Sequence, residues 1–289
     1  MAVLKSWVLA ARPKTLPAAI VPVWAGCLVA WSMTGNLSWR LAVLTVLGAL
    51  FIQIATNFFN DVIDAEKGAD TDQRLGPKRA VAGGLLSPRA LYQGAIFLLV
   101  QAVVCGIFLF QARGWPILLI GIPSLYLSYG YTGGKFPLAY LGLGELFVIL
   151  FFGLVAVAGT VFIQIGEWPM QAWLVGLQIG LLSAVLIAVN NYRDLEEDRA
   201  AQKRTLVVRW GRKPVALLIY LMTVLPAGFV LLTAGPGLCF VISLLLALVF
   251  LGLEFLFLKP DEVAPQLLGL SALHLVLFVF AWHLCLALT

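Results

Sequence analysis

Two short acidic segments carry most of the chemistry that this sequence offers. The first spans about 57–80 and opens with Asn-Phe-Phe-Asn-Asp-Val-Ile-Asp at residues 57–64. The second spans about 190–213 and opens with Asn-Asn-Tyr-Arg-Asp at residues 190–194. Nine of the fourteen Asp and Glu residues of the chain lie in these segments. Carboxylate and amide oxygens are the hard ligands that Mg²⁺ prefers, so the pattern indicates a candidate metal site.

The spacing within each segment places its polar residues on one face of a helix. Residues three, four and seven apart share a helical face. In the first segment this face holds Asn57, Asn60 or Asp61, and Asp64. In the second it holds Asn190 or Asn191, Asp194 and Asp198. Two such faces that meet over a cavity could hold metal ions around a diphosphate.

Basic residues lie close behind the acidic residues of both segments, among them Lys67, Arg74 and Arg79 in the first and Lys203 in the second. Carboxylates alone would repel a phosphate, whereas carboxylates with a metal ion and basic neighbours would bind it. A solvated loop of mixed charge is the better explanation for Glu66, Asp72, Glu196, Glu197 and Arg89. It explains Asp64, Asp194 and Asp198 poorly, because carboxylates that continue straight out of apolar helices usually serve a site.

The rest of the chain must place these residues at a membrane. Hydrophobic residues make up 62% of the 289 residues, charged residues only 11%, and the mean hydropathy is +0.99. A helix needs about 20 apolar residues to cross a bilayer, and helices satisfy their own backbone there. We therefore predict an all-α, polytopic membrane protein, with one domain over residues 1–289. About nine spans are expected, at roughly 16–33, 39–59, 91–111, 115–131, 141–164, 172–190, 215–234, 236–257 and 267–287.

The basic residues predict the orientation of these spans. All but Arg40 and Arg113 of the nineteen Lys and Arg residues fall on one side of the predicted topology. Positive charge stays cytoplasmic, so the N-terminus and both acidic segments are expected on the cytoplasmic side of the cytoplasmic (inner) membrane. This topology accounts for the net charge of +5 without a nucleic-acid partner. The N-terminus lacks a small-residue cleavage pattern, so the first span is expected to be retained.

The cysteines and histidines predict packing rather than chemistry. Each of the four cysteines lies alone in an apolar run, and no C-x-x-C spacing occurs. His274 and His283 are nine residues apart, which does not place them on one helical face. Metal and redox sites built from these residues are therefore not expected.

Several motifs carry a resemblance to a known family. N-D-x-x-D at 60–64 and N-x-x-x-D-x-x-x-D at 190–198 resemble the aspartate-rich motifs of the UbiA-type intramembrane aromatic prenyltransferases. Further motifs resemble those of the 1,4-dihydroxy-2-naphthoate polyprenyltransferase branch of this family. They are A-R-P-K-T-L-P at 11–17, G-A-D-T at 68–71, R-L-G-P at 74–77, Y-T-G-G at 131–134, Y-L-G-L-G-E at 140–145 and K-R-T-L at 203–206. The resemblance covers the chain from about residue 7 to the last span.

Two departures from the family pattern bear on the site. Gly68 stands where the wider superfamily often has a further Asp, and Asp70 could take its place. Gln202 stands where this branch commonly has Gly before Lys-x-Thr, in the loop that follows the second motif.

The resemblance implies a helical bundle around a central cavity and a specific reaction. A polyprenyl group would pass from its allylic diphosphate to 1,4-dihydroxy-2-naphthoate, with loss of CO₂, to give demethylmenaquinol for menaquinone biosynthesis. The implied cofactor is Mg²⁺, as two ions that bridge the diphosphate. The implied partners are polyprenyl diphosphate, 1,4-dihydroxy-2-naphthoate and membrane lipid.

The resemblance also implies roles for individual residues. Ionisation of the allylic bond places negative charge on diphosphate, which Mg²⁺ stabilises, and positive charge on carbon, which needs a dry aromatic site. The implied catalytic residues are Asp64, Asp194 and Asp198, within a metal-ligand set of Asn60, Asp61, Asp64, Asp70, Asn190, Asp194 and Asp198. The implied diphosphate-binding residues are Lys67, Arg74, Lys135 and Lys203. The implied acceptor or cation pocket contains Asn57, Tyr131, Glu145 and Arg193, with Tyr126, Tyr129, Phe147, Phe151 and Phe152 as further aromatic candidates.

Other functions compete with this interpretation. A sister prenyltransferase would use 4-hydroxybenzoate or homogentisate, because acceptor choice depends on a few pocket contacts. An ion-coupled transporter could also use paired acidic sites, but its sites lie near mid-membrane, whereas these acids lie at the predicted cytoplasmic ends of helices. The D-G-x-x-A-R segment of phosphatidyl-alcohol transferases is absent from the sequence.

Overall fold

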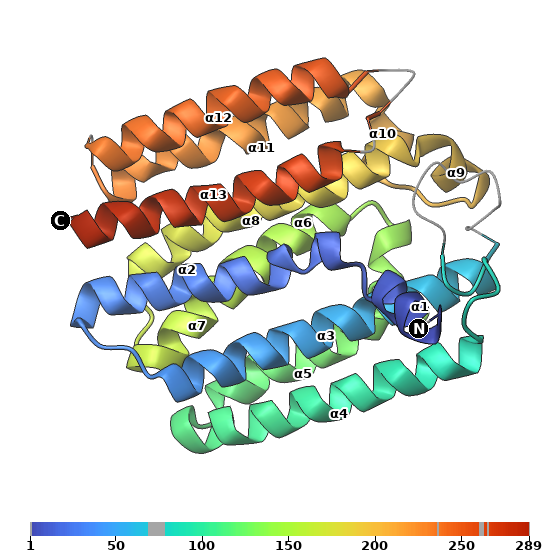
Figure 1. The fold of residues 1–289 in the computed structure, drawn as a ribbon, viewed down its shortest axis with the longest axis horizontal. Coiled ribbons are helices and arrows are strands. Elements are labelled where there is room, and N and C mark those ends of the chain that lie inside the picture. The colour runs from blue at the N-terminus through green and yellow to red at the C-terminus, as the bar shows by residue number, and fades with distance from the viewer. Residues whose placement is uncertain (1, 69–78, 236, 260–262, 265, 289) are drawn as a thin grey trace.

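The computed structural model describes residues 2–68, 79–235, 237–259, 263–264 and 266–288. Within these ranges the chain is helical and forms no β-strand. The long helices lie roughly side by side in one bundle (Figure 1). The predicted all-α class is therefore confirmed.

Eight helical segments are long and apolar enough to cross a membrane. They are α2 (Pro17–Thr34), α3 (Trp39–Glu66), α4 (Pro88–Arg113), the continuous segment Gly144–Ile165, α8 (Met170–Arg193), α11 (Arg212–Thr233), α12 (Leu238–Phe257) and α13 (Leu267–Leu288). The remaining expected span, 115–131, is α5 (Pro116–Gly130), which has only 15 residues. Nine full-length spans therefore remain a prediction.

The two termini lie at opposite ends of the bundle (Figure 1). A chain that crosses the membrane an odd number of times has its termini on opposite sides, so this arrangement agrees with the predicted topology. The side of the membrane on which the N-terminus lies remains a prediction.

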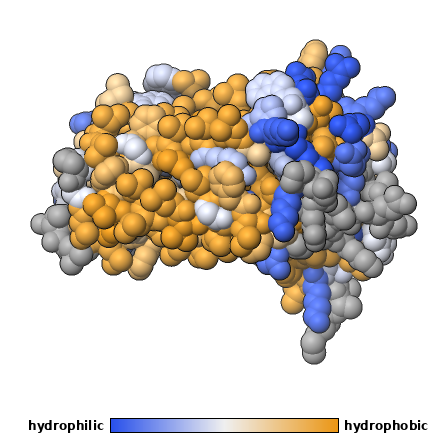
Figure 2. Space-filling view, turned by 90° about the horizontal axis from the view of Figure 1, so that it is seen from above, coloured by the Kyte–Doolittle hydropathy of each residue, from blue (hydrophilic) through white to orange (hydrophobic). Residues whose placement is uncertain are grey.

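One end of the bundle carries the short helices and most of the visible hydrophilic surface. It holds α1 (Ala2–Ala11), α9 (Leu195–Ala200) and α10 (Leu206–Trp210), beside the last turns of α3 and α8 (Figure 1). Hydrophilic side chains gather at this end, and hydrophobic side chains cover most of the rest of the visible face (Figure 2). We call it the polar end.

Local sequence signals explain where several helices begin and end. The Ser38 side chain accepts from the amide of Leu41 at the start of α3, and Ser87 accepts from the amide of Ala90 at the start of α4. Such capping satisfies amides that have no partner within the helix. Helix α2 ends at Gly35, whose φ of 66° is left-handed and favours glycine.

Glycines allow the helices around the bundle centre to approach closely. The segment Gly144–Ile165 consists of α6 (Gly144–Val148), the π-helix η3 (Ile149–Val155) and α7 (Ala156–Ile165). A Cβ at Gly153 of η3 would lie 2.4 Å from the carbonyl oxygen of Gly176 and from Cα of Gly180, both on α8. Small residues of this kind are typical of packed membrane helices, and π-helical turns often occur at functional sites.

The histidines pack against aromatic rings in the bundle. His274 stacks on Phe250 with ring centroids 4.4 Å apart, and His283 accepts a hydrogen bond from Trp24 Nε1 over 3.3 Å. Both arrangements agree with the predicted packing role. The cysteines Cys239 and Cys285, isolated in the sequence, form a hydrogen bond with each other across α12 and α13.

Candidate active site

The two acidic segments meet at the polar end of the bundle. Asn60 and Asp64 lie in the last turns of α3, and we call them the α3 half-site. Asn190, Asp194 and Asp198 lie where α8 passes into α9, and we call them the α8 half-site. Both half-sites border one polar cavity of about 70 Å³. The three carboxylates are buried, with exposed fractions of 4% for Asp64, 4% for Asp194 and 8% for Asp198.

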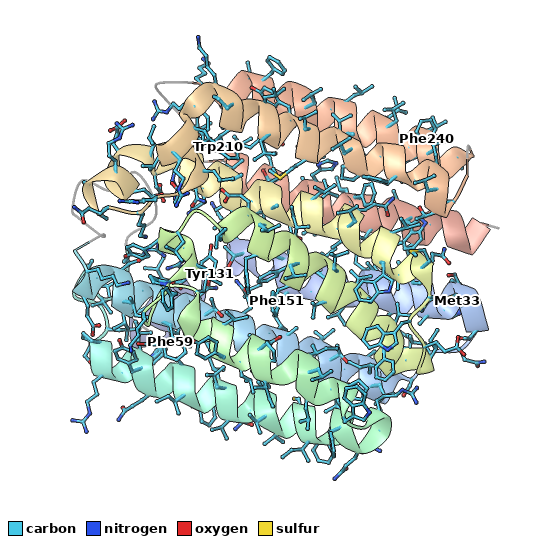
Figure 3. The ribbon with its side chains drawn as sticks, turned by 180° about the vertical axis from the view of Figure 1, so that it is seen from behind. Met33, Phe59, Tyr131, Phe151, Trp210 and Phe240 are labelled. Carbon is cyan, nitrogen blue, oxygen red and sulfur yellow. The ribbon has the colours of Figure 1, made fainter. Side chains whose placement is uncertain are left out.

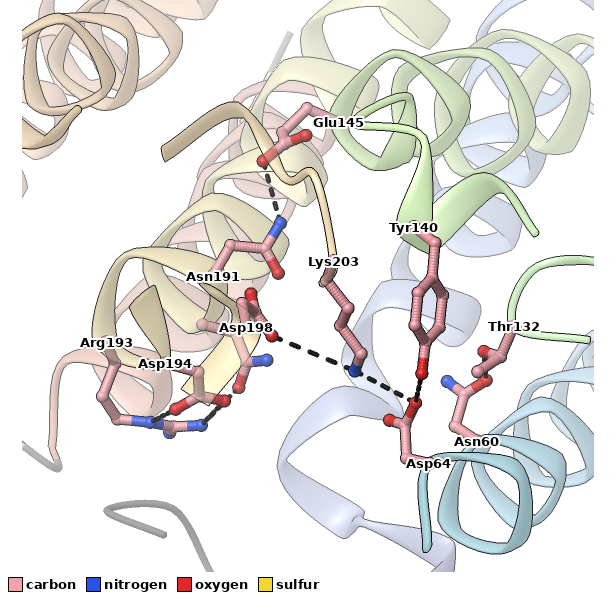
Figure 4. A network of polar contacts seen from close by, with 11 residues as sticks. Asn60, Asp64, Thr132, Tyr140, Glu145, Asn191, Arg193, Asp194, Asp198 and Lys203 are labelled. Atoms are coloured by element: carbon pink, nitrogen blue, oxygen red, sulfur yellow. Dashed lines mark hydrogen bonds and ion pairs between the residues drawn. The ribbon is translucent and has the colours of Figure 1, made fainter. Parts of the chain in front are cut away.

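The α3 half-site is held by residues from distant segments. The Tyr140 hydroxyl, in the short helix η2 (Leu138–Tyr140), donates to Asp64 Oδ1 over 3.0 Å. The Thr132 hydroxyl, just beyond α5, donates to Asn60 Oδ1 (Figure 4). Loops between membrane helices therefore fix both side chains of this half-site.

The α8 half-site is held largely by its own helix. Arg193 donates from Nε to Asp194 Oδ1 over 2.5 Å and from Nη2 to Asp194 Oδ2 over 2.8 Å. The same guanidinium donates to Asn190 Oδ1 over 2.7 Å. Beside them, Asn191 Nδ2 donates to Glu145 Oε1 over 3.0 Å, which fixes a further buried carboxylate at the cavity (Figure 4).

Lys203 joins the two half-sites. Its ammonium lies 3.0 Å from Asp64 Oδ1 and 3.9 Å from Asp198 Oδ1 (Figure 4). The Lys203 side chain is only 14% exposed. One partly buried cation therefore neutralises part of the charge on both sides of the polar cavity.

The loop that carries Lys203 has a special backbone. The amide of Lys203 donates to the carbonyl of Asp198 over 2.8 Å, and Gln202 has a φ of 56°, in the left-handed region. This is the position where the family pattern has glycine, which adopts such a φ without strain. The amide of Arg204 donates to the carbonyl of Tyr140 over 3.0 Å, and a Cβ at Gly142 would lie 2.4 Å from the Arg204 carbonyl oxygen. The loops that carry Tyr140 and Lys203 are thus packed against each other.

A second cation lies at the edge of this network. Lys67 Nζ donates to the carbonyl of Thr132 over 2.8 Å and sits 4.0 Å from the centroid of the Tyr140 ring. Partial burial lowers the pKa of the Lys67 ammonium, nearby Asp64 raises it, and Lys203 lowers it further. Burial and the charge of Asp64 raise the pKa of the Tyr140 hydroxyl, so this phenol remains a hydrogen-bond donor at neutral pH.

Some predicted site residues have other partners in the structure. The Asp61 carboxylate accepts from the amides of Ala80 and Val81 over 3.0 and 2.9 Å, which ties the segment before α4 to α3. Asn57 Nδ2 donates to the carbonyl of Ala11 over 2.9 Å and so holds the end of α1. Lys135 is exposed and borders neither of the cavities described here. Asp70 and Arg74 lie outside the described residues.

A larger, mostly apolar cavity of about 1,020 Å³ continues from the polar one. Residues that border both cavities are Arg12, Asn60, Arg79, Tyr131, Ile187 and Asn190. Its walls come from α2, α3, α4, α5, Gly144–Ile165 and α8. Phe147 and Phe151 border it with ring centroids 4.4 Å apart, and Figure 3 shows Tyr131 and Phe151 towards the middle of the bundle. Of the other aromatic candidates, Phe152 borders this cavity, whereas Tyr126 and Tyr129 do not.

Comparisons with known proteins identify the fold and the sequence family. The model of the UbiA prenyltransferase family matches residues 19–267. The chain belongs to the UbiA prenyltransferase family. The predicted family is thereby confirmed.

The relatives of this UbiA-family chain are similar over most of their length. A 1,4-dihydroxy-2-naphthoate octaprenyltransferase of Haemophilus influenzae is 31% identical over 287 residues, which cover 95% of this chain and 93% of the relative. One of the same name from Mycobacterium tuberculosis is 36% identical over 239 residues, covering 82% and 81%.

Solved structures of UbiA homologues share the fold. The homologue from Archaeoglobus fulgidus, bound to DMAPP and Mg²⁺, has a TM-score of 0.69 at 17% identity and covers 98% of this chain and 100% of its own. The apo homologue from Aeropyrum pernix has a TM-score of 0.72 at 15% identity, with 94% and 98% covered.

The donor atoms around the polar cavity of this UbiA-family chain fit Mg²⁺ that is shared with a phosphate ligand. Among the described residues, no three His, Cys, Asp or Glu side chains come together as an all-protein metal site. Instead, each half-site offers carboxylate and amide oxygens on one side of a small cavity. Mg²⁺ usually takes one or two carboxylates and completes its shell with water and substrate phosphate. The arrangement therefore suits a diphosphate held between the half-sites.

Two residues of the network were missed as site residues from the sequence. Thr132 and Tyr140 bond to Asn60 and Asp64 from 72 and 76 residues away. Both stand within motifs that carry the family resemblance: Thr132 directly follows Tyr131, and Tyr140 opens the motif at 140–145. Those motifs were the available signal, although they do not say which acidic residue each side chain contacts.

Proposed function

We propose that this protein transfers a polyprenyl group from an allylic diphosphate to 1,4-dihydroxy-2-naphthoate, with loss of CO₂, to give demethylmenaquinol. The observation that carries the proposal is the pair of buried acidic half-sites around a polar cavity, which continues into a long apolar cavity. The names of the relatives from Haemophilus influenzae and Mycobacterium tuberculosis support this acceptor.

The diphosphate of the donor binds in the polar cavity. Asn60 and Asp64 on one side, and Asn190, Asp194 and Asp198 on the other, would hold two Mg²⁺ ions together with it. Mg²⁺ supplies positive charge that stabilises the departing diphosphate. Lys203 and Lys67 add positive charge from the protein, at the joint between the half-sites and at the edge of the network. Asp61 instead anchors the chain before α4, because its two carboxylate oxygens accept from backbone amides and, unlike Asp194, it does not border the polar cavity.

The polyprenyl tail lies in the apolar cavity. Along α3 the lining runs from Asn60 to Thr45, a distance of about 22 Å at the rise of an α-helix. The walls are mostly aliphatic and aromatic, so tail burial is driven by the removal of apolar surface from water. A cavity of this length favours a donor with several isoprenoid units over a short one.

The allylic carbon ionises at the junction of the two cavities. Tyr131 borders both cavities, and the stacked rings of Phe147 and Phe151 border the larger one. Aromatic faces stabilise a developing cation, and apolar walls limit the water that would otherwise trap it as an alcohol.

The acceptor ring enters the polar end of the large cavity. Arg12 and Lys14 border this cavity and provide positive charge for the carboxylate of the acceptor. Arg193 borders it too, with its guanidinium paired to Asp194. Asn57 borders it as well, and Glu145 faces the adjoining polar cavity. Arg12 has a φ of 52°, and a non-glycine residue in this region is often held there for function.

The polar end faces the cytoplasm in the cytoplasmic membrane of a bacterium. The distribution of basic residues supports this orientation, since all but two fall on the predicted cytoplasmic side. In this orientation both substrates reach the site from the cytoplasm or the bilayer, and membrane lipid surrounds the apolar helices. No nucleic acid takes part.

Product formation by the purified protein tests the proposed function. The protein, in detergent or lipid nanodiscs, would receive 1,4-dihydroxy-2-naphthoate, octaprenyl diphosphate and Mg²⁺, with 4-hydroxybenzoate as a competing acceptor. We expect prenylated, decarboxylated naphthoquinol by mass spectrometry, and no product after chelation of Mg²⁺. Product from 4-hydroxybenzoate alone would contradict the acceptor, and absence of transfer to any aromatic acceptor would contradict the reaction.

A further inference from the structure

Hydroxyl side chains that border the large cavity are nearly all bonded to their own helix. Each donates to a backbone carbonyl three or four residues earlier: Thr45 to Leu41, Thr56 to Ile52, Ser124 to Ile120, Ser128 to Leu125 and Thr160 to Ala156. This is the usual way for a hydroxyl to satisfy itself in an apolar helix. Such side chains have no need of a ligand.

Ser183 is an exception in this wall. It lies on α8, is only 1% exposed and borders the large cavity, yet its Oγ has no hydrogen-bond partner among the described residues. Gln53 on α3 resembles it, since it is 8% exposed, borders the same cavity and has an Oε1 without a partner in the described part of the chain. Its Nε2 is directed to Asn57 Oδ1, 3.5 Å away.

These two residues occupy equivalent positions below the two half-sites. Ser183 precedes Asn190 by seven residues, and Gln53 precedes Asn60 by seven residues. Seven residues are two helical turns, or about 10 Å along the axis. Each side chain therefore borders the large cavity two turns deeper than its half-site, in a wall that is otherwise mostly apolar.

A buried polar atom without a partner is unfavourable, so these positions are suited to a polar group that arrives with a ligand. The polyprenyl tail has no hydrogen-bonding atom and leaves both side chains unsatisfied. A phenolic hydroxyl can donate to Gln53 Oε1, and a phenolic hydroxyl can equally exchange a hydrogen bond with Ser183 Oγ. The aromatic acceptor carries two such hydroxyls.

We propose that Ser183 and Gln53 are specificity-determining residues that each bind a ring hydroxyl of the aromatic acceptor inside the large cavity. The proposal rests on the proposed function and deepens it, because it says how a hydroquinone acid is distinguished from an acid with fewer hydroxyls. A site built to bond a hydroxyl rejects the analogue that lacks it, since its buried polar groups then stay unpaired.

The test uses Ser183→Ala and Gln53→Leu in the full-length protein, with Ser271→Ala as a matched control. Ser271 is also buried, at 4% exposed, but its Oγ donates to the carbonyl of Leu267 and it borders neither cavity. For each protein, KM would be measured for the dihydroxy acceptor and for the prenyl donor. Inhibition by 1-hydroxy-2-naphthoate and by 4-hydroxy-2-naphthoate would be measured as well, so that neither analogue needs to react.

We expect Ser183→Ala and Gln53→Leu to raise the KM for the dihydroxy acceptor about five- to tenfold, as for the loss of one hydrogen bond, and to leave the KM for the donor unchanged. For each variant, the analogue that lacks the hydroxyl bound by the substituted residue should inhibit wild type and that variant equally. Ser271→Ala should behave as wild type.

Two results would overturn the proposal. Equal weakening of all three naphthoates by Ser183→Ala and Gln53→Leu would indicate a structural role or a bound water. Unchanged constants in both variants would show that neither residue contacts the acceptor. Failure of the proposed function is distinguishable from both, because wild type itself would then form no product from 1,4-dihydroxy-2-naphthoate.

Discussion

The two half-sites carry similar residues but are assembled in different ways. Asp64 takes its hydrogen bond from Tyr140, 76 residues away, and its ion pair from Lys203. Asp194 is bonded by its neighbour Arg193, which also binds Asn190 three residues earlier. The α8 half-site is therefore largely preformed by one helix, whereas the α3 half-site depends on loops that pack against it. Changes far from α3 in the sequence should weaken that half-site selectively.

Removal of one carboxylate charge should give the largest effect. Asp64→Asn and Asp194→Asn keep the shape of the side chain and remove a metal-ligand charge from one half-site each. We expect each variant to lose at least about 100-fold in kcat/KM for prenyl transfer, because both half-sites act on the same diphosphate. Steady-state kinetics with a saturating donor would measure this loss. A near-normal rate in one of the two variants would show that its half-site is dispensable.

Removal of the Tyr140 hydroxyl should have an intermediate effect that is specific to the α3 half-site. Tyr140→Phe deletes the donor to Asp64 Oδ1 but leaves the ion pair with Lys203. We expect kcat/KM to fall about tenfold, the usual weight of a hydrogen bond to a charged group. The loss should disappear when Tyr140→Phe is combined with Asp64→Asn, because the two changes act through one contact. Losses that multiply independently would contradict this contact as the cause.

The pH dependence should identify the cation at the edge of the α3 half-site. Burial lowers the pKa of Lys67, so its charge is lost at lower pH than for an ordinary lysine, and the alkaline limb of kcat/KM should reflect this loss. Lys67→Arg keeps its charge and should move that limb to higher pH. Lys135→Arg is the control, since Lys135 is exposed and borders neither cavity. A shifted limb in the control, with none in Lys67→Arg, would favour Lys135 as the diphosphate partner.

The smallest effect should come from the loop that carries Lys203 to Asp64. Gln202 is exposed and has a φ of 56°, a conformation that disfavours a side chain by about 1–2 kcal/mol. Gln202→Gly removes this strain but gives the unfolded chain more freedom, so we expect a net gain in stability of about 0.5 kcal/mol. The thermal unfolding midpoint in detergent would measure it. A lower midpoint would mean that the Gln202 side chain stabilises the loop by contacts of its own.

Much of the architecture could be predicted because its causes are local in the sequence. The apolar runs required membrane helices, and the spacing of Asn60, Asp64, Asn190 and Asp194 placed them at the ends of two helices. The unusual position of Gln202 was also visible, since glycine is expected there and the structure has a left-handed φ.

The remaining features depend on tertiary contacts that no local pattern contains. Asp61 satisfies the same spacing as Asp64, but its carboxylate meets the amides of Ala80 and Val81, which only the folded chain brings near. Tyr140 likewise bonds to Asp64 only in the folded chain, because α4 and α5 separate the two residues in the sequence. The sequence likewise does not distinguish Ser183, whose hydroxyl lacks a partner among the described residues, from the other serines in the apolar helices.

The central claim is that both half-sites hold one diphosphate together with Mg²⁺. Isothermal titration calorimetry with an unreactive allylic thiolodiphosphate tests it most directly, in wild type, Asp64→Asn and Asp194→Asn, each with and without Mg²⁺. We predict that wild type binds the analogue only with Mg²⁺ and that either substitution abolishes this binding. Full Mg²⁺-dependent affinity in one of the two variants would contradict the claim, because the diphosphate would then be held by a single half-site.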